Sequence, residues 1–150
     1  MFKHLLVAVD GSGHAEKAVD VAIELARRDG AQLTLMHVLT RSGSDSVPRH
    51  LSGFASVEQV QVTEHDMFER AGQQLLDTAE HKARAHGIAK CGTVLERGDA
   101  ASRIVGCAEE TGADLIVMGR RGLGDLGGLL RGSVSHKVAQ ASELCCLTVK

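Results

Sequence analysis

The chain has 150 residues, 43% of them hydrophobic, and its acidic and basic residues are interspersed to a formal net charge of −2. This length suits a single domain, residues 1–150, with a sizeable core. The absence of a basic stripe argues against a nucleic-acid or membrane-surface partner. No signal peptide is apparent and no apolar run approaches membrane-spanning length, so we expect a cytoplasmic protein that does not cross a membrane.

The cysteines and histidines give no sign of a metal centre. Cys91, Cys107, Cys145 and Cys146 contain no CxxC pair, and a strand would send Cys145 and Cys146 to opposite faces, so we expect four reduced thiols. The eight histidines are scattered without HxxxH or HxxEH spacing. Structural or surface roles are therefore expected for them, rather than a zinc site.

Apolar strands and amphipathic helices alternate from the start of the chain. Residues 4–9 predict a buried strand that ends at the turn of residues 10–13. A helix with apolar residues at helical spacing follows, and Gly30 stops it. Residues 32–39 predict a second strand, and the polar stretch of about 40–56 is expected to be a mobile loop.

The rest of the chain continues this alternation. The predicted elements are a helix over about 57–86, a strand over 88–95, a helix that Asp99 caps and Gly112 ends, a strand over 115–118, a helix over 133–141 and a strand over 145–149. On the long helix, apolar residues recur at four-residue steps: Met67, Ala71, Leu75 and Ala79.

Continuous apolar strands joined by helices predict an α/β fold with a parallel sheet covered on both faces. With right-handed crossovers, one topology is a doubly wound five-stranded sheet in the order 3-2-1-4-5. Ligands of such sheets bind outside the carboxyl ends of the strands, at the switch point between the first and fourth strands. Two segments leave these ends: residues 10–13 and the glycine-rich residues 119–135.

The glycine-rich segment predicts a phosphate-binding loop. Glycine lets a ligand approach the bare backbone, and successive N–H groups can surround an anion. The segment then opens a helix, where Ser133 and Ser135 could bind a phosphate or reach Mg²⁺. Three arginines supply positive charge: Arg120, Arg121 and Arg131. The Walker A sequence is absent, and the alternative interpretation is a surface loop whose glycines serve mobility.

The spacing Gly119-x2-Gly122-x9-Gly132-Ser133 resembles the ATP-binding signature of the universal stress protein family, in its nucleotide-binding branch. The resemblance covers the whole chain, and it includes the first, second and fourth predicted strands, at residues 6–12, 33–38 and 113–119. It implies a Rossmann-like fold of the adenine nucleotide alpha hydrolase type, with ATP as cofactor and Mg²⁺ as a possible companion.

The resemblance also implies roles for individual residues. Asp10 would lie beside the ribose or adenine, where a carboxylate can accept hydrogen bonds from ribose hydroxyls; it could equally serve as a turn residue. The backbone of Val38 would meet adenine. The other implied nucleotide-binding residues are Ala8 and Val9 near the base, Met118, Gly119 and Arg120 along the nucleotide, and Gly122, Gly132, Ser133, Val134 and Ser135 around the phosphates.

Three functions remain open from the residues. The first is a regulatory or stress-response protein that binds adenine nucleotide. The second is a slow ATPase, for which no convincing general base is present, and the third is a nucleotide-free dimeric interaction module. Another α/β adenine-nucleotide protein with enzymatic activity is the runner-up. The resemblance further implies a homodimer through the last strand, because the apolar edge at residues 146–149 must be covered.

Overall fold

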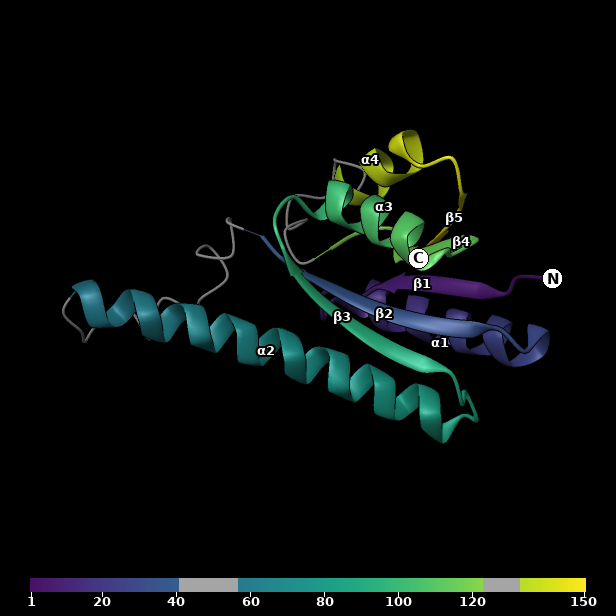
Figure 1. Ribbon diagram of the computed structural model, residues 1–150, viewed down its shortest axis with the longest axis horizontal. Coiled ribbons are helices and arrows are strands. Elements are labelled where there is room, and N and C mark those ends of the chain that lie inside the picture. The colour runs from purple at the N-terminus through teal and green to yellow at the C-terminus, as the bar shows by residue number, and fades with distance from the viewer. Residues whose placement is uncertain (41–56, 123–132) are drawn as a thin grey trace.

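The computed structural model describes residues 1–40, 57–122 and 133–150. Strands and helices alternate along them (Figure 1). Their bounds are β1 His4–Ala8, α1 Gly13–Asp29, β2 Gln32–Leu39, α2 Val57–Ala85, β3 Cys91–Arg97, α3 Ala100–Thr111, β4 Leu115–Gly119, α4 Ser133–Ala141 and β5 Cys145–Val149. The predicted loop at about 40–56 lies, beyond Thr40, outside the described residues.

The five strands form one parallel sheet in the order β3-β2-β1-β4-β5. The predicted doubly wound topology is therefore confirmed. Val7 in the central strand β1 pairs with Leu35 of β2 on one side and Val117 of β4 on the other. The carboxyl ends of β1 and β4 consequently lie next to each other, and this places the switch point between them.

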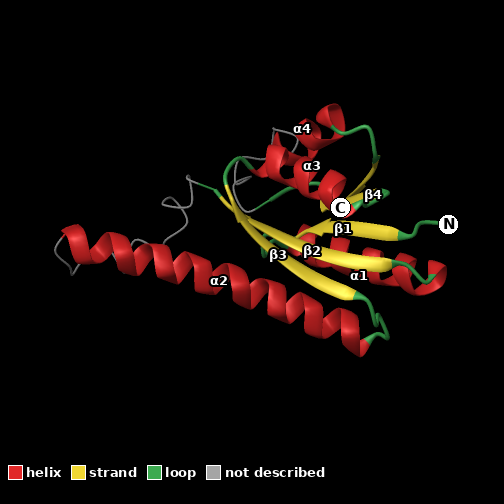
Figure 2. Ribbon diagram, in the orientation of Figure 1, coloured by secondary structure: helices red, strands yellow, loops and turns green. Residues whose placement is uncertain are grey.

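Helices cover both faces of the sheet (Figure 2). Because side chains alternate along a strand, Leu5 and Val7 of β1 enter the core under α1 and α2, whereas Leu6 enters the core under α3 and α4. All three side chains are fully buried. Each face thus has its own apolar core, as expected for strands with continuous apolar runs.

The helices begin and end where the turn chemistry predicts. Ser12 caps α1 by accepting a hydrogen bond from the Ala15 N–H at 3.2 Å, and Asp99 caps α3 through the Ser102 N–H. Gly30 and Gly112 end these helices in the left-handed conformation, with φ of 67° and 68°. Within the described ranges, none of the helices combines the length and apolar character needed to traverse a bilayer.

The third strand starts later than predicted. Ile88 belongs to the helix terminus, because its N–H donates to the Ala83 carbonyl at 3.1 Å and its side chain is buried in the core. Pairing with β2 begins only at Cys91. Ile88, the apolar residue directly after the helix-stopping Gly87, is therefore part of the helix cap and not of the strand.

The apolar series at four-residue steps follows the buried side of α2 only in part. Met67 is 53% exposed, whereas Leu76 is fully buried. Steps of four residues advance about 400° around a helix, so a series at that spacing drifts about 40° per step away from the core. The buried line along α2 mixes steps of three and four: Gly72, Leu76, Ala79 and Ala83.

Candidate functional site

The two segments that leave the switch point are joined by hydrogen bonds. Asp10 follows β1 and accepts the Ser12 N–H at Oδ1, 2.9 Å away, which closes a tight turn around Gly11. The Ser12 hydroxyl in turn donates to the Arg121 carbonyl at 3.3 Å. Ser12 therefore caps α1 and also links it to the chain leaving β4. A serine directly before a helix indicates the first role but not the second.

Two glycines after β4 make close approaches that a side chain would block. A Cβ at Gly122 would lie 2.6 Å from Asp10 Oδ2, so the carboxylate rests against bare backbone. A Cβ at Gly119 would lie 2.8 Å from the Ala15 nitrogen and from the His14 carbonyl carbon. The glycine spacing thus keeps the chain leaving β4 tightly against both Asp10 and the start of α1.

The start of α4 is hydrogen-bonded to the chain that leaves β4. The Arg120 N–H donates to the Val149 carbonyl at 2.7 Å, which extends the β4–β5 ladder beyond Gly119. The Ser135 hydroxyl, in a residue only 8% exposed, donates to the Arg120 carbonyl at 3.1 Å. Ser133 and Val134 stay exposed at the first turn of the nine-residue helix, where backbone N–H groups and the helix dipole favour an anion.

The carboxyl end of β2 completes this edge of the sheet. Val38 lies two residues beyond Met36, the last β2 residue that pairs with β1. Its half-buried side chain packs against the core under α3 and α4. Among the described residues, its backbone N–H has no hydrogen-bond partner. A main-chain donor is thereby presented beside the Asp10 turn.

The predicted site residues share one edge of the sheet, but not one face. Ala8, Val38 and Met118 lie on the face of α3 and α4, with Met118 buried to 2% exposure as part of the floor. Val9 enters the opposite core and is 7% exposed. Gly132, like the rest of 123–132, lies outside the described residues.

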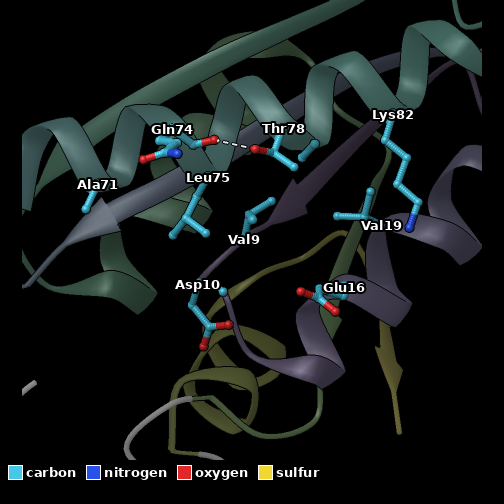
Figure 3. Close-up of a pocket in the computed structure, with 11 residues that line it drawn as sticks. Val9, Asp10, Glu16, Val19, Ala71, Gln74, Leu75, Thr78 and Lys82 are labelled. Atoms are coloured by element: carbon cyan, nitrogen blue, oxygen red, sulfur yellow. Dashed lines mark hydrogen bonds between the residues drawn. The ribbon is translucent and has the colours of Figure 1, made fainter.

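Val9 and Asp10 instead line a cavity of about 570 Å³ between α1 and α2 (Figure 3). Leu75 of α2 points toward Val9, and Glu16 of α1 and Lys82 of α2 also line this cavity. It shares only Val9 and Asp10 with the predicted nucleotide site. No sequence motif predicts this cavity, because its walls come from α1 and α2, which are far apart in the chain.

Among the described residues at the switch point, metal-ligating side chains do not form a cluster. Across the described parts of the chain, no group of three or more His, Cys, Asp or Glu side chains is arranged to hold a metal ion. All four cysteines are free thiols, and Cys145 and Cys146 point to opposite sides of β5 as expected for neighbours in a strand.

The topology and the joined switch-point turns define a doubly wound α/β domain of the Rossmann-like kind. The model of the Universal stress protein family matches residues 1–150. The chain belongs to the universal stress protein family.

Relatives along the whole chain agree with this assignment. The chain is 36% identical to universal stress protein YxiE of Bacillus subtilis over 153 residues, which covers all of both proteins. The structure of hypothetical protein MJ0577 is similar at a TM-score of 0.79 and 25% identity, over 100% of this chain and 96% of that one. A universal stress protein in complex with cAMP matches at a TM-score of 0.69 and 25% identity, over 99% and 96%.

Proposed function

We propose that this protein binds an adenine nucleotide at the switch point, with ATP as the expected ligand. The observation that carries the proposal is the Asp10 carboxylate held against the bare backbone of Gly122, beside the Val38 N–H, which has no hydrogen-bond partner in the described part of the chain. A carboxylate is suited to ribose hydroxyls, and a backbone N–H is suited to a ring nitrogen of the base. The similar protein in complex with cAMP supports a ligand of this class.

The remaining residues fit a polyphosphate. Ser133 and Val134, exposed at the start of α4, offer N–H groups and a helix dipole to negative charge. Glycine at positions 119 and 122 keeps this chain close to α1 and Asp10, and Arg120 and Arg121 lie half-buried between the two glycines, where they supply positive charge. Mg²⁺ accompanying ATP would be held chiefly by the phosphates, as is usual for this ion.

We propose a regulatory or stress-response role in the cytoplasm, with at most slow hydrolysis of ATP. Phosphoryl transfer to water requires a group that orients the attacking molecule. Asp10, the acidic residue nearest the switch point in sequence, already accepts the Ser12 N–H in a turn. We therefore expect the domain at residues 1–150 to act by binding and releasing nucleotide, not by hydrolysing it rapidly.

Calorimetric titration with ATP and Mg²⁺ tests the binding site. Asp10→Asn keeps the acceptor of the turn but removes the charge, so we expect at least about ten-fold weaker binding, since hydrogen bonds to charged groups contribute about 1.5–3 kcal/mol. Glu109→Gln is the matched control, because it makes the same change of charge at an exposed position near the end of α3. Failure of the wild-type protein to bind ATP or AMP at millimolar concentration would refute the proposal.

We also propose a homodimer through β5. This strand lies at one edge of the sheet. Its apolar residues Cys146, Leu147 and Val149 are only half-buried. Val149 directs its carbonyl toward β4, so by alternation Thr148 directs its N–H to the open edge. Pro tolerates edge positions of this kind. Light scattering should show a dimer for the wild type and a monomer for Thr148→Pro, with Thr148→Val as control; a wild-type monomer at micromolar concentration would contradict the proposal.

A further inference from the structure

The hydrogen-bond ladder between β1 and β2 stops one bond short at the proposed site. Alternate residues of β2 direct their backbone groups to β1: Gln32 N–H donates to the Lys3 carbonyl at 2.9 Å, and the Met36 carbonyl accepts the Val9 N–H at 2.8 Å. If the pattern continued, the Val38 N–H would donate to the Val9 carbonyl. No such bond is present, although both residues are described.

The side chain of His37 takes the place of the Val38 N–H at the Val9 carbonyl. Its Nδ1 lies 2.6 Å from the Val9 carbonyl oxygen. A carbonyl oxygen can only accept, so Nδ1 must carry the proton and donate it. A side-chain donor has therefore replaced the backbone donor of the ladder, and the Val38 N–H is left without a partner among the described residues.

Helix α2 holds the imidazole in this position. A Cβ at Gly72 would lie only 2.8 Å from His37 Cδ2 and 3.0 Å from Leu95 Cδ1. The helix can therefore approach the ring because residue 72 has no side chain. Since side chains alternate along β2, His37 points toward α2 while Val38 packs on the opposite face.

We infer that His37 is a positioning residue for nucleotide recognition: by donating to the Val9 carbonyl, it keeps the Val38 N–H free for the base of the ligand. The inference rests on the proposed function and adds the reason for base selectivity. The backbone N–H and carbonyl of Val38 offer one donor and one acceptor side by side. They match the edge of adenine, where N1 accepts a hydrogen bond and the N6 amino group donates one. An inosine base, with a donor at N1 and an acceptor at position 6, presents the reverse pattern.

The first test follows the Val38 amide in the ligand-free protein by NMR hydrogen exchange. In the wild type it should exchange at least about ten-fold faster than the Met36 amide, which lies inside the ladder. His37→Leu removes the competing donor, so the Val38 N–H should pair with the Val9 carbonyl and slow to the range of Met36. His37→Asn, whose side-chain nitrogen takes the place of Nδ1, should restore fast exchange.

The second test measures affinity for AMP, IMP and inorganic tripolyphosphate. His37→Leu should weaken AMP binding about three- to ten-fold, the equivalent of one hydrogen bond, and leave tripolyphosphate binding unchanged. His37→Asn should recover AMP binding. The matched control is His86→Leu, because the His86 Nδ1 also lies beside a backbone carbonyl, that of Lys82 at 2.8 Å, at the far end of α2.

Each failure has its own meaning. A wild-type Val38 amide as protected as that of Met36, or a folded His37→Leu protein with unchanged AMP affinity, would overturn the positioning role. If the wild type shows the expected exchange but binds no nucleotide, the proposed function is refuted and base recognition with it. Gly72→Ala gives a second route should His37→Leu not fold, because its Cβ displaces the ring, and it should slow Val38 exchange in the same way.

Discussion

Gly119→Ala is the sharpest test of the packing that builds the site. Gly119 ends β4 at the switch point. An added Cβ would lie 2.8 Å from the Ala15 nitrogen, 2.8 Å from the His14 carbonyl carbon and 2.9 Å from the His14 Cβ. Two of these atoms are backbone of the first turn of α1, which cannot turn aside as a flexible side chain can. The helix start or the strand end must move as a unit.

Two opposing effects set the size of the change. Overpacking a tightly fitted region costs about 1–3 kcal/mol, and a rigid obstacle favours the upper part of that range. Replacing glycine by alanine also restricts the unfolded chain, which returns about 0.4–1 kcal/mol. The net expectation is a loss of about 1–2 kcal/mol in the free energy of unfolding. For a chain of this length, that corresponds to a fall in Tm of about 3–8 °C.

Gly92→Ala is the matched control, measured with Gly119→Ala in urea denaturation. Gly92 also lies in a strand, β3, but a Cβ there would meet nothing within 4 Å. Only the effect on the unfolded chain remains, so Gly92→Ala should be neutral or about 0.5 kcal/mol more stable than the wild type. Equal stability of the two variants would show that the contact of α1 with Gly119 is not tight, and the packing argument would fail.

Two further predictions use ionisable groups. The Arg28 guanidinium holds the pKa of Asp29 well below its ordinary value, so the carboxylate stabilises the fold fully above about pH 4 and loses this effect as the pH falls. Asp29→Asn should therefore lower Tm more at pH 7 than at pH 2.5, and equal losses would contradict the assignment. Burial raises the pKa of the Cys91 and Cys107 thiols to about 11, so at pH 8 a thiol reagent should label exposed Cys145 first; rapid labelling of all the cysteines in the folded protein would refute this.

The topology could be predicted because each level of the sequence points to the same answer. The apolar run at residues 4–9 and the run at 115–118 required burial on both faces, which a parallel sheet under helices provides. Gly30 and Gly112 marked helix ends that the structure confirms. These signals are local in the sequence, and the crossover rule then leaves few arrangements of the strands.

The structure departs from the simplest interpretation of the sequence where a local signal had two possible uses. Ile88 follows a helix-stopping glycine and is apolar, so it suited a strand and a helix cap equally well. The stripe beginning at Met67 had helical spacing, but the side of α2 that meets the sheet depends on the angle at which the helix crosses it. Contacts over long sequence separations decided both cases.

The histidines show the same limit. Their scattering in the sequence indicated structural or surface roles, and His4 has a structural one, with Nδ1 3.0 Å from the Thr111 carbonyl and Nε2 2.8 Å from the Thr34 hydroxyl. His37 makes a contact of equal quality, yet it lies at the edge where the ligand is proposed to bind. His4 lies at the amino end of β1 with both ring nitrogens bonded, whereas His37 lies near the carboxyl end of β2 with Nδ1 bonded to the Val9 carbonyl, so the position of each residue in the fold separates their roles.

Much of the proposed recognition depends on the main chain. The Val38 N–H, the bare backbone at Gly122 and the first turn of α4 each present peptide groups, and only Asp10 presents a charged side chain in this set. Side chains that merely cover such groups can change without loss of the contact, whereas a glycine that permits a close approach cannot. Glycine spacing is therefore the part of the sequence that indicates this site most strongly. Residues such as His37, which act through a hydrogen bond to the backbone and not on the ligand, become recognisable only once the fold is known.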